Sequence, residues 1–99
     1  MNLEALRTLC AAGEIMVTQH CMKRMTERNI ELSRVVGTVI HGEIVEDYPT
    51  DYPFPSCLML HDGLHVVAGL GDGKAWLITA YIPSRDEWES DLKTRRTKQ

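Results

Sequence analysis

The spacing of apolar residues changes at Gly42, and this change constrains the fold more than any other feature of the sequence. Before Gly42, apolar residues recur every three or four positions, as they do along one face of an α-helix. After it, apolar and polar residues alternate in short runs, which is typical of β-strands with one covered face. Helices that precede strands, instead of alternating with them, predict an α+β fold with the helices on one face of an antiparallel sheet.

Three helices are predicted in the first part of the chain. The first spans 3–11, and the second begins after Thr18, a good N-cap, and runs to about Arg28. Asn29 follows at a position where a residue in the left-handed conformation commonly ends a helix, and asparagine tolerates that conformation. The third helix is expected over about 31–41, where apolar residues follow the i, i+3, i+4, i+7 spacing.

Four antiparallel strands are predicted after Gly42. The run EIVEDY suits a strand, and YPTDYPFP is too rich in proline to join the interior of a sheet, so it is expected to connect two strands. Two hairpins follow, around Asp62-Gly63 and Asp72-Gly73, because Asp-Gly favours two-residue turns.

With two-residue turns, the alternation of side chains divides the last three strands between two faces. One face carries Cys57, Met59, His61, Leu64, Val66, Ala68, Leu77, Thr79 and Tyr81. The other face carries Leu58, Leu60, His65, Val67, Trp76, Ile78 and Ala80. The second set is the more apolar, so we expect it to face the helices, with His65 as its one polar member.

The chain is expected to form a single domain over residues 1–92. Trp88 indicates a short C-terminal helix over 85–92 that packs on the rest of the domain. The remaining segment, 93–99, reads KTRRTKQ and is predicted to be a basic tail that frays.

The composition indicates the cellular compartment of the protein and argues against one class of function. Ninety-nine residues with three cysteines at unpaired spacings indicate reduced thiols, so we expect a cytoplasmic protein. The N-terminal MNLEALRTLC lacks the apolar core of a signal peptide, and no apolar run is long enough to span a membrane. A net charge of −3 argues against a general nucleic-acid-binding protein, since those are usually basic.

One stretch concentrates cations despite this acidic balance. In HCMKRMTERNI, the side chains of His20, Arg24 and Arg28 lie four residues apart and form a row beside the apolar stripe of the second helix. The planar guanidinium group of arginine can bind a phosphate through two hydrogen bonds, and histidine can transfer protons near neutral pH. The alternative is an ordinary row of surface charges whose stems cover the core margin, paired with Glu27 or Glu31.

A metal site is not expected. Cys57, His61 and His65 are zinc-ligand types, but they straddle a hairpin without a CxxC spacing, and the predicted register places His65 on the opposite face. We likewise expect no small-molecule cofactor.

The strings H-x3-RM-x2-RNI, GEIVEDYP, PSCL, LHVVAG and ITAYIP, followed by Trp88, resemble a family of small bacterial proteins known only as domain of unknown function 4258. That family is similar to RelE/ParE toxins of the barnase–colicin–RelE ribonuclease group. The resemblance implies a metal-independent ribonuclease toxin that cleaves messenger RNA, with a cognate antitoxin of zinc-ribbon, helix-turn-helix type. The matching polar positions are His20, Arg24, Arg28, His65, Thr79 and Tyr81.

Three hypotheses follow. The first is this ribonuclease, with His20 as acid or base, Arg24 and Arg28 on the phosphate, and Tyr81 or Thr79 as an accessory donor; His65 contributes only if it reaches the same cleft. The second is a non-catalytic protein-binding module of the same fold, which an exposed apolar patch would favour. The third is a structural homo-oligomer that pairs through an exposed edge strand.

Overall fold

Three helices form where the apolar spacing predicts them. The computed structural model describes residues 1–97, and its helices are α1 (Leu3–Ala11), α2 (Gln19–Arg28) and α3 (Leu32–His41). Thr18 caps α2, since its Oγ1 accepts a hydrogen bond from the amide of Cys21 at 3.0 Å. Asn29 ends that helix at φ 54° and ψ 46°, so its predicted left-handed conformation is confirmed. None of the described helices is long and apolar enough to cross a membrane.

The helices pack with a five-stranded mixed sheet, one strand of which lies between α1 and α2, so the α+β class is confirmed and the prediction of four antiparallel strands is wrong. The strands are β1 (Ile15–Val17), β2 (Glu43–Tyr48), β3 (Ser56–His61), β4 (Leu64–Gly71) and β5 (Lys74–Tyr81), in the order β1-β5-β4-β3-β2. The additional strand, β1, pairs in parallel with β5 through Ile15–Ala75 and Val17–Leu77. Both Asp-Gly pairs form the predicted two-residue turns, with positive φ at all four residues.

A β-bulge in β5 decides which side chains share a face. Val67 pairs with Thr79 and Ala68 with Leu77, so Ile78 is an extra residue without a partner on β4. Beyond the bulge, His65 pairs directly with Tyr81. Paired residues point to the same side of a sheet, so His65, Thr79 and Tyr81 lie on one face, contrary to the predicted register.

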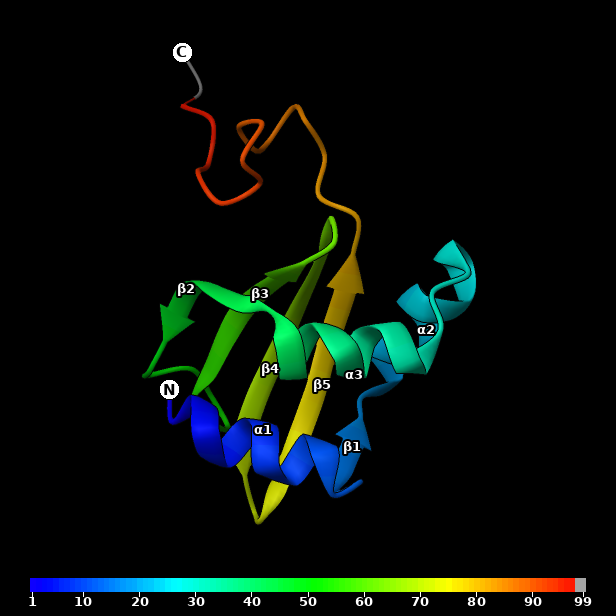
Figure 1. The fold of residues 1–99 in the computed structure, drawn as a ribbon, viewed down its shortest axis with the longest axis vertical. Coiled ribbons are helices and arrows are strands. Elements are labelled where there is room, and N and C mark those ends of the chain that lie inside the picture. Colours follow the sequence, from blue (N-terminus) through cyan, green and yellow to red (C-terminus); the bar gives the residue numbers. More distant parts are fainter. Residues whose placement is uncertain (98–99) are drawn as a thin grey trace.

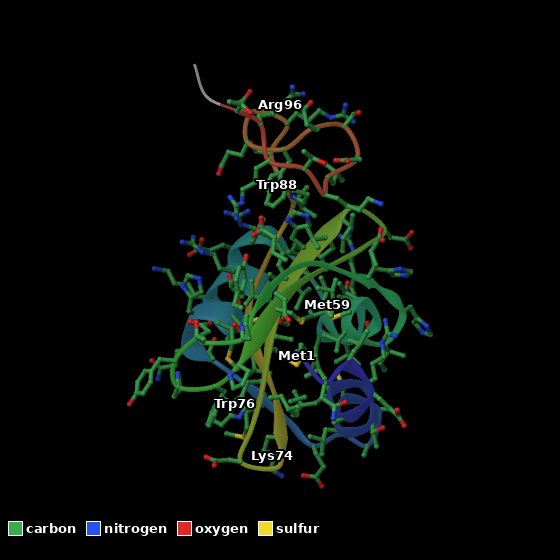
Figure 2. The ribbon with its side chains drawn as sticks, turned by 90° about the vertical axis from the view of Figure 1, so that its left-hand side faces the viewer. Met1, Met59, Lys74, Trp76, Trp88 and Arg96 are labelled. Carbon is green, nitrogen blue, oxygen red and sulfur yellow. The ribbon has the colours of Figure 1, made fainter. Side chains whose placement is uncertain are left out.

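The core lies on the face opposite to the one predicted. Cys57, Met59, Leu64, Val66, Ala68, Leu77 and Ala80 are fully buried in one cluster with residues of α1, α2 and α3. The predicted core face, apart from Ala80, therefore points away from α1 and α3. Figure 2 shows the two sides: Met59 lies toward the helices, and Trp76 lies on the other side.

The second helix covers the edge of β5 rather than the face of the sheet. β1 pairs with the first half of β5 and ends at Val17, and α2 then lies beside the second half (Figure 1). Thr18 joins the two elements, because its amide donates to the carbonyl of Leu77 at 3.1 Å and its hydroxyl donates to that of Ile78 at 2.8 Å. The cap of α2 is thus bonded to the bulge, which fixes the helix against β5.

The predicted helix over 85–92 is absent, and the segment that follows β5 is irregular. It stands at the end of the sheet where β5 ends (Figure 1), and a bridge between Trp88 and Arg95 closes it on itself. Trp88 is nevertheless buried, at 2% exposure, and points toward the sheet (Figure 2). Lys98 and Gln99, at the end of the predicted tail, lie outside the described residues.

Candidate active site

An open cavity of about 460 Å³ lies between α2, the end of β5 and the segment after β5. The row on α2 forms one wall, β5 contributes the floor, and the segment after β5 forms the opposite wall. The lining residues are His20, Arg24, Arg28, Thr79, Tyr81, Ile82, Ser84, Glu87, Trp88 and Arg95. Five of the six polar residues expected to act together, all except His65, therefore line one cavity.

The three side chains of the α2 row are not equivalent. Arg24 donates to Glu27 at 3.1 Å, one turn along the same helix, so its charge is partly compensated. Within residues 1–97, neither Arg28 nor His20 makes an ion pair, and both are exposed. The alternative of a compensated surface row describes Arg24 but leaves the cation of Arg28 free at the cavity wall.

The hydroxyl group of Tyr81 is hydrogen-bonded to a buried histidine, His65. His65 is fully buried, and its Nε2 lies 2.7 Å from the carbonyl oxygen of Leu92, which can only accept a hydrogen bond. Nε2 must therefore carry the proton, and in the neutral ring Nδ1 is an acceptor. The hydroxyl of Tyr81 lies 3.2 Å from that Nδ1 and donates to it, which leaves the lone pairs of the tyrosine oxygen for another partner.

Burial sets the protonation of this pair. It lowers the pKa of His65, an effect only partly offset by the bond to Leu92 and by the charge of Glu46. Burial also raises the pKa of Tyr81, so the phenol stays protonated at neutral pH. His65 does not line the cavity, but it contacts two residues that do, Tyr81 and Trp88.

The far wall of the cavity is built by Trp88 and Arg95. The indole of Trp88 packs edge-on against the ring of His65, with the centroids 4.6 Å apart, and the guanidinium of Arg95 lies 4.5 Å from the indole centroid. Arg95 also donates from Nε and Nη2 to the two carboxylate oxygens of Glu46, at 2.8 and 3.0 Å. These bonds lower the pKa of Glu46, so the pair stays ionised at neutral pH.

Sequence reasoning missed several residues of this site. Ser84, Glu87 and Arg95 line the cavity, but they follow the last strand in a segment without periodicity, so nothing in the spacing relates them to α2. The charge of KTRRTKQ was the available signal, yet that segment was predicted to fray. In the structure, Arg95 contacts Glu46, and Arg96 contacts Glu89 and the carbonyl oxygen of Arg85.

The cysteines lie apart from the cavity. Cys10, Cys21 and Cys57 are buried and free of disulfides. Burial raises the pKa of all three thiols, that of Cys57 to about 11, so they stay protonated and are unsuited to act as nucleophiles. Across residues 1–97 no cluster of three or more histidine, cysteine, aspartate or glutamate side chains could hold a metal ion.

The buried histidine predicts a pH dependence of stability. His65 has a lower pKa in the folded than in the unfolded state, so the unfolded chain binds more protons as the pH falls below about 6.5. We expect the free energy of unfolding, measured with urea, to decrease from about pH 7 to about pH 5, and to decrease less in His65→Gln. His41→Gln, a change at an exposed histidine, should keep the wild-type slope. An unchanged slope in His65→Gln would contradict the assignment.

The family model for a domain of unknown function, DUF4258, matches residues 17–82, which is two thirds of the chain. The protein therefore belongs to this family, as the motifs indicated. The match includes α2 and the whole of β5, but it ends before Ser84, so the far wall of the cavity lies outside it. Neither the comparison with curated proteins nor that with solved structures found a match.

Proposed function

We propose that the protein is a ribonuclease toxin that cleaves messenger RNA without a metal ion. The observation that carries the proposal is one cavity that His20 and Arg28 of α2 line together with Tyr81 of β5. His20 is exposed to solvent, and Arg28 makes no ion pair within residues 1–97. These are the groups that metal-free cleavage of RNA requires, and they come from two elements that the Thr18–Ile78 bond holds together.

The reaction needs three contributions. A base removes the proton of the 2′-hydroxyl as it attacks the adjacent phosphorus, an acid protonates the departing 5′ oxygen, and fixed positive charge stabilises the phosphate oxygens in the transition state. His20 is suited to either proton-transfer role, and Glu87 supplies a second proton-accepting group in the cavity. Arg28 supplies the charge, with Arg24 beside it.

Tyr81 and Thr79 serve the same phosphodiester as hydrogen-bonding groups. Because the proton of Tyr81 points to His65, its oxygen is oriented to accept a hydrogen bond from a sugar hydroxyl. Thr79 lies two residues before it on the same face of β5 and supplies a hydroxyl that can donate to the phosphate.

The proposal is tested with the purified protein in EDTA. We expect cleavage of a single-stranded RNA, products that end in a 2′,3′-cyclic phosphate or its hydrolysis product, and no cleavage of the same sequence as DNA. Expression of the wild type should arrest growth of a bacterial host, and an antitoxin encoded beside the gene should relieve the arrest. Intact RNA after incubation with folded protein, with and without ribosomes, would reject the proposal.

A second candidate is a non-catalytic protein-binding module, favoured by a separate apolar groove. The apolar residues that line this groove, of about 370 Å³, are Tyr52, Pro53, Phe54, Trp76 and Ile78, and Tyr52 is 91% exposed. Met16, which pairs with Trp76, is exposed at 42%. A protein that binds its partner through Trp76 and leaves RNA intact would favour this function over the ribonuclease.

A further inference from the structure

We infer that Arg95 binds a second phosphate of the substrate, so that the ligand of the cavity is an internal stretch of an RNA chain and not a single nucleotide. The inference rests on the proposed function and extends it to a residue outside the family match. Arg95 lines the wall opposite α2, whereas Arg24 and Arg28 line the α2 wall itself. A chain that lies across the floor of β5 would present one phosphate to each wall.

The guanidinium of Arg95 is held in place before any ligand binds. Two of its nitrogens, Nε and Nη2, bond to Glu46, and its plane lies against Trp88, which is itself buried. The bonds to Glu46 use Nε and Nη2 and not Nη1, and the side chain of Arg95 is 56% exposed. A guanidinium that is already fixed and still accessible loses little conformational entropy when it binds a phosphate.

The opposing interpretation is that Arg95 only fastens the segment after β5 to β2 through Glu46. Two further variants separate the interpretations. Glu46→Gln removes the carboxylate but keeps the cation of Arg95. Arg96→Ala removes the neighbouring cation, which bonds to Glu89 and to the carbonyl of Arg85 and does not line the cavity.

The experiment measures binding of a fluorescein-labelled 2′-O-methyl RNA decamer, which cannot be cleaved, by fluorescence anisotropy at several salt concentrations. We expect Arg95→Ala to weaken binding about tenfold and to reduce the slope of log K against log salt by about 0.7, the value for one phosphate contact on a single strand. Arg96→Ala should change neither quantity by as much. Glu46→Gln should lose less affinity than Arg95→Ala, since the glutamine oxygen can still accept one bond from Arg95 and the cation is no longer neutralised.

Chain length tests the second phosphate directly. In competition with the labelled decamer, a 2′-O-methyl dinucleotide with one phosphate should bind wild type and Arg95→Ala alike, while a tetranucleotide should bind the wild type more tightly. Equal losses in Arg95→Ala and Glu46→Gln, or in Arg95→Ala and Arg96→Ala, would overturn the inference while cleavage by the wild type still supported the ribonuclease. Absence of both binding and cleavage in the wild type would instead reject the proposed function.

Discussion

Replacing His20 with alanine is expected to lower the rate of RNA cleavage by about 10²- to 10⁴-fold, the usual contribution of one proton-transferring group. The side chain is exposed in the first turn of α2, and no hydrogen bond within residues 1–97 depends on it. Its removal should therefore leave the unfolding free energy within about 0.5 kcal/mol of the wild type. Cleavage of a synthetic RNA, followed together with thermal unfolding, measures both quantities.

His41 offers a matched control for His20. It is also an exposed histidine on a helix, at the last position of α3, and it does not line the cavity. His41→Ala should cleave RNA at the wild-type rate. A folded His20→Ala protein that retains full activity would remove His20 from the site and leave Glu87 and Tyr81 as the candidates for proton transfer among the cavity residues.

Replacing Arg28 with alanine is expected to reduce kcat by about 10²-fold, at the lower end of the loss seen when one transition-state donor is removed. The effect should fall on kcat more than on KM, because charge accumulates on the phosphate oxygens as the bond forms. Arg24→Ala should lose less, since the guanidinium of Arg24 is already bonded to Glu27. The measurement is a comparison of kcat and KM for both variants on one RNA.

Lys23 supplies the control for Arg28. It is a cation of the same helix that pairs with Glu27 and does not line the cavity. Lys23→Ala should change the cleavage rate little. Arg28→Lys should be more active than Arg28→Ala, because lysine keeps the positive charge but not the two hydrogen bonds of the guanidinium group. Equal losses in Lys23→Ala and Arg28→Ala would mean that only the general charge of α2 matters.

Local features of the fold were predictable from the sequence because their causes lie within a few residues. Thr18 caps α2 and Asn29 ends it through bonds to the same helix, and each Asp-Gly turn depends on its own two residues. The row of His20, Arg24 and Arg28 was found for the same reason, since helical spacing alone places these side chains together. The position of the cavity residues in the segment after β5 has no such local cause.

The features that were missed depend on contacts between distant parts of the chain. The three residues of β1 form a strand only because β5, about sixty residues later, supplies the hydrogen bonds. The bulge at Ile78 is invisible in the alternation of LITAY, yet this one extra residue brings Tyr81 to the face of His65 and Ala80 to the core. Trp88 was expected to stabilise a helix, but it packs against His65, so its burial has a tertiary cause.

The way in which the cavity is assembled has a consequence for protein synthesis. Its walls come from residues 20–28 and 84–95, and its floor comes from residues 79–82. The early residues therefore cannot form the cavity before the late residues have been synthesised. On the ribosome, α2 can form as soon as it emerges, but β5 is not there to receive the Thr18 cap until residues near Ile78 have followed. The nascent chain therefore has no complete site until residues 84–95 have emerged. The proposed ribonuclease activity would therefore begin only after Arg95 has left the ribosome.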